Sequence, residues 1–236
     1  MQFGITVALA LGGLLLDVLV IAAVLRSRAS RYAFLLLCVI GDLLTTVVEI
    51  RPQFAYENAS AAEKIMFANL YWWDERIMQV LTFTLVISLI YLATSKLRPR
   101  RILFLGVVCG TAAFVGLTFL IEFSSRIATW KWMTYWTRDL NFGSAILDLG
   151  LWAVLIGATK KDYRLLIISG ALGLRFTGGA IGQALRSMSP DWQLAGADFI
   201  GLANLACLYL WWQAFAAPKG KPGIAVKVPK ETSDEV

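Results

Sequence analysis

The feature that most constrains this sequence is a regular alternation of long apolar segments with short clusters of basic residues. A membrane-spanning helix needs about 20 mostly apolar residues, and seven segments of the 236-residue chain have this character. Basic loops stay on the cytoplasmic side of a membrane, so the alternation predicts both insertion and orientation. The clusters are Arg26/Arg28/Arg31, Lys96/Arg98/Arg100/Arg101, Lys160/Lys161/Arg164 and Lys219/Lys221/Lys227/Lys230.

The predicted fold is all-α: a polytopic membrane protein with a seven-transmembrane-helix bundle in residues 1–217. Its N-terminus is expected outside and its C-terminus in the cytoplasm, in a bacterial inner membrane. The first segment carries Asp17 and no basic leader, so we expect a retained helix, not a signal peptide. Residues 218–236, rich in Lys, Pro and acidic residues, predict a disordered cytoplasmic tail. The expected spans are about 4–25, 32–50, 74–95, 102–123, 141–159, 165–187 and 194–216.

The composition limits which partners and cofactors are expected. The chain is 58% hydrophobic with a net charge of +6. Its basic residues sit in the predicted cytoplasmic loops, so the expected counter-charge is the lipid bilayer's anionic headgroups and not nucleic acid. Histidine, the commonest ligand of haem, copper and zinc, is absent, so no cofactor and no metal site are predicted. Cys38, Cys109 and Cys207 all fall within spans, which predicts no disulfide.

Two longer outer segments carry local signals. Ser60 and Glu63 have the spacing of a capping box. They predict either a short helix in the outer interface or a helical extension of the third span. The other segment, 124–139, is rich in tryptophan, which concentrates at membrane interfaces. We predict an outer aromatic belt, with Trp211 and Trp212 marking the inner interface.

Four ionisable residues fall near the middle of predicted spans: Asp17, Asp42, Asp148 and Arg175. Each costs roughly 2.5–3.5 kcal/mol to insert, so each needs a partner or a function. The preferred pairing is Arg175 with Asp148, and Asp42 is the competing partner. The alternatives are ion pairing for helix packing and a functional, water- or proton-accessible layer.

Further polar residues collect near the predicted outer helix ends. If they face inward, they line an outer vestibule for a ligand; if they face outward, they are solvated helix ends. The set is Glu49, Asp74, Glu75, Arg76, Gln79, Glu122, Arg138, Asp139, Gln183, Arg186 and Asp198.

Small residues predict where helices pack closely. The 165–187 segment contains Ser169-xxx-Gly173 and Gly178-xxx-Gly182, and the 102–123 segment contains Gly106-xxx-Gly110. Close packing is the favoured interpretation, and a hinge beside Arg175 is the alternative.

Tyr71-Trp72-Trp73-Asp74-Glu75 and the glycine-rich segment around Arg175 resemble uncharacterised seven-helix bacterial inner-membrane proteins. The resemblance implies a general layout and no function. Motifs of better-known seven-helix families are missing: segment 194–216 has no lysine to bind retinal, and Thr94-Ser95-Lys96 replaces the Asp-Arg-Tyr of G-protein-coupled receptors.

The leading functional hypothesis is a receptor-like or sensory module, or a membrane subunit that binds a partner protein. It would take a small-molecule ligand in the outer vestibule. The alternative is a small-solute or proton-coupled transporter with Asp17, Asp42 and Asp148 as its relay. No enzymatic activity is predicted, because the sequence shows no nucleophile–base arrangement and no histidine to act as the usual general base.

Overall fold

A computed structural model describes residues 2–27, 30–55, 60–94, 100–123, 129–157, 162–189 and 192–216. The predicted tail and parts of the basic clusters lie outside these ranges. The described chain is all-α, as predicted. Its elements are α1 (Gln2–Arg26), the 3-10 turn η1 (Ser30–Tyr32), α2 (Ala33–Ala55), α3 (Ala61–Ala93), α4 (Arg100–Glu122), α5 (Thr129–Gly157), α6 (Tyr163–Met188) and α7 (Gln193–Ala216).

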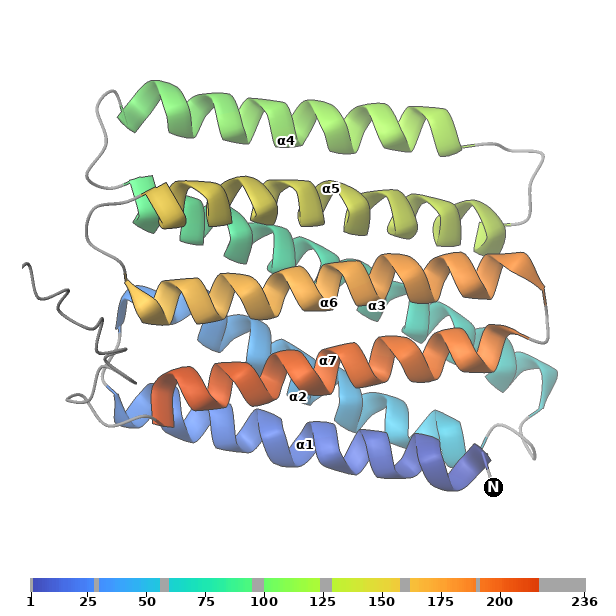
Figure 1. Cartoon of the computed structure of the whole chain (residues 1–236). Helices are drawn as coiled ribbons and strands as arrows, with labels where there is room; N and C mark the ends of the chain where they lie inside the picture. The colour runs from blue at the N-terminus through green and yellow to red at the C-terminus, as the bar shows by residue number, and fades with distance from the viewer. Residues whose placement is uncertain are drawn as a thin grey trace, which may run out of the picture.

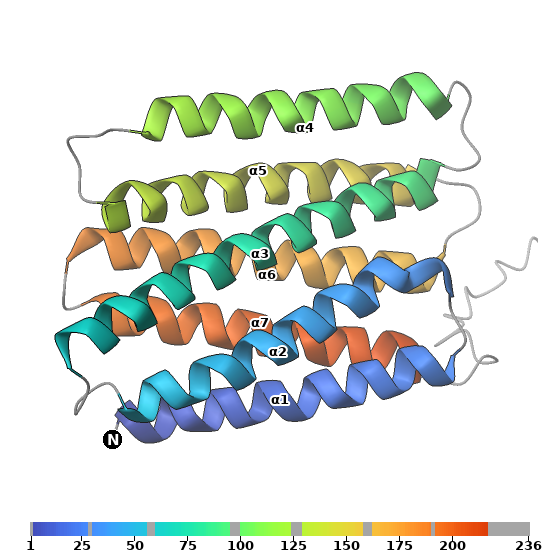
Figure 2. The ribbon, with the colours of Figure 1, turned by 180° about the vertical axis from the view of Figure 1, so that it is seen from behind.

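The long helices lie side by side in two layers (Figures 1 and 2). One layer has the order α4, α5, α6, α7, α1, and α2 and α3 cross behind it. Successive helices alternate in direction, so α1, α3, α5 and α7 begin at one end of the bundle. This end, where the chain starts, is called the N-terminal end below. Helix α4 lies at the edge of the bundle, in contact with α3 and α5.

Within the described ranges, six helices are long and apolar enough to cross a membrane, which defines a multi-pass membrane architecture. α2 is not among these six; it carries the charged residues Asp42, Glu49 and Arg51. The seven-span count and the orientation of the termini therefore stay predictions. The six segments are Val7–Arg26, Arg76–Ala93, Phe104–Ile121, Tyr135–Gly157, Tyr163–Met188 and Gln193–Ala216.

Two helices begin well before their predicted spans at the N-terminal end. α3 begins at Ala61, so the predicted interface helix is continuous with the third span. Its capping box is confirmed: Ser60 Oγ accepts from the Glu63 backbone N–H, and the Glu63 carboxylate accepts from Ser60 N at 2.8 Å. α5 begins at Thr129, about three turns before the predicted span. Its first part is helical but contains polar residues, so it lacks the apolar character on which the predicted span was based.

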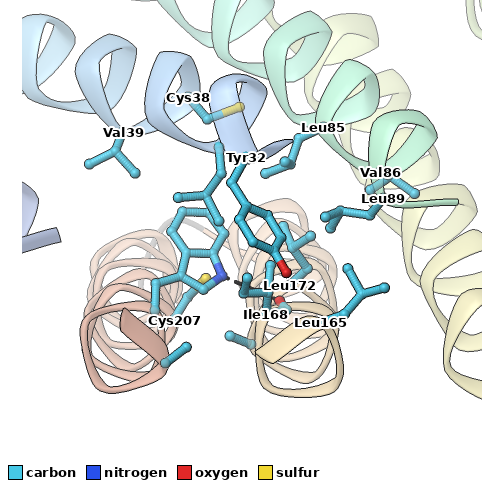
Figure 3. Close-up of a cluster of buried hydrophobic side chains, with 14 of the residues drawn as sticks. Tyr32, Cys38, Val39, Leu85, Val86, Leu89, Leu165, Ile168, Leu172 and Cys207 are labelled. Carbon is cyan, nitrogen blue, oxygen red and sulfur yellow. Dashed lines mark hydrogen bonds between the residues drawn. The ribbon is translucent and has the colours of Figure 1, made fainter. Parts of the chain in front are cut away.

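The apolar core lies near the opposite end of the bundle. Leu85, Leu89, Ile168 and Leu172 meet there from α3 and α6 (Figure 3). The prediction that Trp211 marks a lipid interface is wrong, because its side chain is 0% exposed. Its indole Nε1 donates to the Ile168 carbonyl at 3.3 Å, which satisfies the one polar atom of the ring inside the core.

Helix α6 packs closely against α7 through its glycines. A Cβ on Gly182 would lie 2.7 Å from the Gly196 carbonyl oxygen of α7, and a Cβ on Gly178 would meet Ala203. The predicted Gly178-xxx-Gly182 contact is therefore confirmed. The corresponding prediction for α4 is wrong: Cβ atoms at Gly106 and Gly110 would find no atom within 4 Å among the described residues.

Candidate functional site

A buried ion pair joins the two layers of the bundle. Arg175 of α6 donates from Nη2 to Asp42 Oδ1 of α2 at 3.1 Å. Asn204 of α7 donates from Nδ2 to the other carboxylate oxygen, Oδ2, at 3.0 Å. Both Asp42 oxygens therefore have a partner, and three helices are linked through one side chain that is only 11% exposed. The preferred pairing of Arg175 with Asp148 is wrong.

Helix geometry explains the correct partner. Asp148 of α5 accepts from Ser169 Oγ at 2.8 Å, and a Cβ on Gly173 would lie 2.8 Å from Asp148 Oδ2. Ser169 and Gly173 are one turn apart and share the α6 face that contacts α5. Arg175 lies two residues beyond Gly173, about 200° around the helix, and so points away from α5. The close approach at Gly173 leaves no room for a side chain beside the Asp148 carboxylate.

Asp17 of α1 is the least satisfied charged group described. Its side chain is 0% exposed, and neither carboxylate oxygen has a hydrogen-bond partner within the described residues. It interacts electrostatically with Asp42 and Arg175. A buried carboxylate without a hydrogen-bond partner is costly, so Asp17 is a candidate for a functional role as well as for helix packing.

A polar cavity of about 320 Å³ opens above the ion pair, between α2, α3, α6 and α7. Asp42, Arg175 and Asn204 form its floor, and Glu49 and Asp74 lie nearer the N-terminal end of the bundle. Thr45, Thr46, Gln183 and Arg186 also line it. Two arginines therefore face the same space as three carboxylates.

The acids near the cavity mouth interact with each other. Asp74 precedes the apolar segment Arg76–Ala93 by two residues. Burial raises the pKa of Asp74 to about 6, and the nearby Asp42 charge adds to this; a side-chain hydrogen bond with Glu49 works in the opposite direction. Asp74 therefore changes charge in mildly acidic conditions.

The structure brings only part of the predicted vestibule set to this cavity: Glu49, Asp74, Gln183 and Arg186. Gln79 and Arg76 line a separate cavity between α3, α4 and α5. Arg138 and Asp139 pair with each other at 2.9 Å, and Asp198 is not among the residues lining the cavities described. Glu75 and Glu122 belong to α3 and α4, but their side chains lie outside the described structure.

Sequence reasoning missed two groups that shape the cavity. Asn204 was not among the predicted site residues, although an amide inside an apolar helix is itself a signal of interhelical hydrogen bonding. Thr46 donates its hydroxyl to the Asp42 carbonyl at 2.8 Å, so its methyl group is left to line the cavity. Within the described ranges, no group of three His, Cys, Asp or Glu residues is placed to hold a metal ion.

The fold and the apolar helices together define the class: an α-helical, multi-pass membrane protein. Comparisons find no matching family model, no matching curated protein and no matching solved structure.

Proposed function

We propose that this protein is a receptor-like membrane protein that binds a small polar molecule in the cavity above the Arg175–Asp42 pair. The observation that carries the proposal is the placement of both charge signs around one partly enclosed space of about 320 Å³. This volume lies in the range of roughly 300–1,000 Å³ that ligand sites occupy.

The charges indicate the class of ligand. Arg175 and Arg186 can receive a carboxylate, and Glu49 and Asp74 can receive an ammonium group. A zwitterion such as an amino acid satisfies both sets at once. Helix α6 runs unbroken from Tyr163 to Met188 beside the cavity. This continuity favours binding within a fixed bundle over the broken-helix sites of many transporters.

The proposed topology places the cavity mouth outside the cell. Helix α2 is proposed as the seventh span, since it lies in the bundle beside α1 and α3 and its central charge, Asp42, is paired. The basic clusters then lie at the opposite, cytoplasmic end. Ser60→Cys is expected to react with a membrane-impermeant maleimide in intact cells, and Ser27→Cys is not. Labelling at position 27 and none at position 60 would show that the topology is the opposite of the one proposed.

Ligand binding is tested by thermal unfolding of the purified protein in detergent, in the presence of each standard amino acid and of betaine. At least one zwitterion is expected to raise the melting temperature in a saturable manner. Arg186→Gln should abolish the rise, and Arg138→Gln, an equal change outside the cavity, should preserve it. The proposal fails if no member of the panel stabilises the protein, or if both variants behave alike.

The second candidate is a proton-coupled transporter, favoured by the unpartnered carboxylate of Asp17 behind the cavity floor. Asp17 interacts electrostatically with Asp42, which lines the cavity, so the two carboxylates lie close enough to form part of a relay. Proteoliposomes separate the two functions. A transporter takes up the stabilising ligand in a pH-dependent manner that Asp17→Asn abolishes, whereas a receptor binds the ligand and shows no uptake.

A further inference from the structure

A second cavity, of about 360 Å³, lies between α3, α4 and α5. It extends along α3 from Arg76 to Ile87, a rise of about 16 Å. Most of its lining is apolar and includes Phe83, Val115 and Leu140. It reaches the outer surface at Val80, whose side chain is 65% exposed. In a bilayer this surface faces lipid, so the cavity is open to molecules dissolved in the membrane.

Two polar atoms of this cavity lack a partner among the described residues: Gln79 Nε2 and Thr111 Oγ1. Thr111 is only 7% exposed. Thr82, Thr94 and Thr118, by contrast, each donate to the carbonyl four residues earlier in their own helix, at 2.6 to 2.9 Å. Thr111 forgoes this bond, and its hydroxyl is left for a group inside the cavity.

Helix α4 covers one side of this cavity from the edge of the bundle, and its outward face has no neighbouring helix among the described residues. The space beside Gly106, Gly110 and Gly116 is open, with no atom within 4 Å of an added Cβ in the described chain. The bulk of the α4 surface is apolar and exposed, as at Leu105 and Leu120. Aromatic contacts such as Tyr91–Phe104 and Phe119–Trp136, with ring centroids 5.2 and 5.4 Å apart, hold α4 to its neighbours. The cavity lies between these helices and has room for a chain-like molecule.

The polar groups select the head of such a molecule. The Gln79 amide N–H and the Arg76 guanidinium are donors, and Arg76 is positively charged and lies at the N-terminal end of the cavity. Donors and a positive charge above an apolar slot complement an anionic acceptor joined to a hydrocarbon chain. A carboxylate suits both the amide donor and the guanidinium, because each of its oxygens accepts hydrogen bonds and a guanidinium binds it in a bidentate manner.

We propose that this cavity binds a single-chain lipid carboxylate, with the head at Arg76 and Gln79 and the chain directed toward Phe83 and Ile87. The site shares no lining residue with the polar cavity, although a smaller cavity lined by Gln79 and Arg175 lies between the two. The proposal does not depend on the zwitterion proposed for the polar cavity. The lipid site leaves the bundle toward the bilayer at Val80, so its occupant arrives from the membrane and not from water.

Native mass spectrometry of the detergent-purified full chain tests the site, with palmitate, palmitate methyl ester and a lysophosphatidic acid as probes. Palmitate is expected to give a saturable one-to-one adduct, at least tenfold tighter than the methyl ester, which lacks the anionic head. An adduct with lysophosphatidic acid and none with palmitate would overturn the carboxylate assignment, and absence of any saturable adduct would overturn the site.

Matched variants locate the adduct. Val115→Phe fills the cavity and should weaken palmitate binding at least tenfold, whereas Leu117→Phe, on the exposed face of the same helix, should leave it within twofold. Gln79→Leu should weaken binding and raise the melting temperature, because it removes a buried donor that lacks a partner. Unchanged binding in both Val115→Phe and Gln79→Leu contradicts the proposal, and Gln79→Leu keeps it testable if Val115→Phe does not fold.

Discussion

Among single residues, Arg175 has the largest predicted effect on stability. Its side chain holds Asp42 at 3.1 Å and is 19% exposed, so it is largely desolvated. Breaking a buried pair from one side leaves an uncompensated charge. Arg175→Leu is expected to destabilise the protein by on the order of 3 kcal/mol, measured as a lower melting temperature.

The matched control for this loss is Arg138→Leu. Arg138 pairs with its neighbour Asp139, and both side chains are more than a quarter exposed. An exposed pair contributes about 1 kcal/mol or less. The double variant Arg175→Leu/Asp42→Leu should recover part of the stability, because it removes both charges together. Equal losses in Arg175→Leu and Arg138→Leu would refute the role of the buried pair.

Asp74 predicts a pH dependence. Burial raises its folded-state pKa to about 6 from an ordinary value of 3.8, so the folded protein binds this proton more tightly than the unfolded chain. The resulting stabilisation is fully present below the ordinary value and is lost as the pH rises through about 6. Asp74→Asn should remove this dependence of the melting temperature, and Asp139→Asn should retain it. The charged groups that face Asp74 across the cavity are Glu49, Asp42 and Arg186, and they are the same in both variants.

The candidate residues were predictable from sequence, but their partners were not. An ionisable side chain inside an apolar segment is visible without a structure, which is why Asp17, Asp42, Asp148 and Arg175 were identified. The choice between Asp42 and Asp148 depends on which face of α6 meets which neighbour. That adjacency arises from tertiary packing and leaves no trace in the spacing of residues along the chain.

Among the elements, α6 and α4 use glycine in opposite ways. Gly182 approaches the α7 backbone so closely that a methyl group would strike the Gly196 carbonyl. Gly182→Ala is expected to cost about 1–3 kcal/mol through overpacking. Gly110→Ala, on the open face of α4, should be neutral or stabilising by up to about 1 kcal/mol, because alanine is the better helix former. Thermal unfolding in one detergent measures both, and similar losses at the two sites would contradict the packing described.

The centres of the helices were predictable, but some ends were not. Apolar segments of membrane-spanning length place the middle of each helix, and the Ser60–Glu63 capping box marks the start of α3. The first three turns of α5 mix aromatic, basic and polar side chains, so they lack the apolar character that located its span. The same small-xxx-small pattern lies in a close helix contact in α6 and on an open face in α4. The pattern allows a second helix to approach closely but does not require that one be there.

At the scale of the whole molecule, the exposed apolar surface and the buried charged layer together support a membrane bundle with a polar interior. Large apolar side chains such as Leu44, Leu120 and Leu149 are more than half exposed. The charged residues Asp17, Asp42 and Asp148 are buried. This distribution is suited to a bilayer and costly in water. Composition predicted this arrangement, but not which helices would enclose the cavity.

The most direct measurement compares two cysteines on α2 in a background without the native Cys38, Cys109 and Cys207. Thr46 lines the polar cavity. Leu44 lies two residues earlier, about 3 Å away along the helix axis, and is 59% exposed on the lipid-facing surface. In membranes, a charged methanethiosulfonate reagent should modify Thr46→Cys and leave Leu44→Cys unreacted, since the first faces water inside the bundle and the second faces lipid. Faster modification of Leu44→Cys than of Thr46→Cys would contradict the central claim.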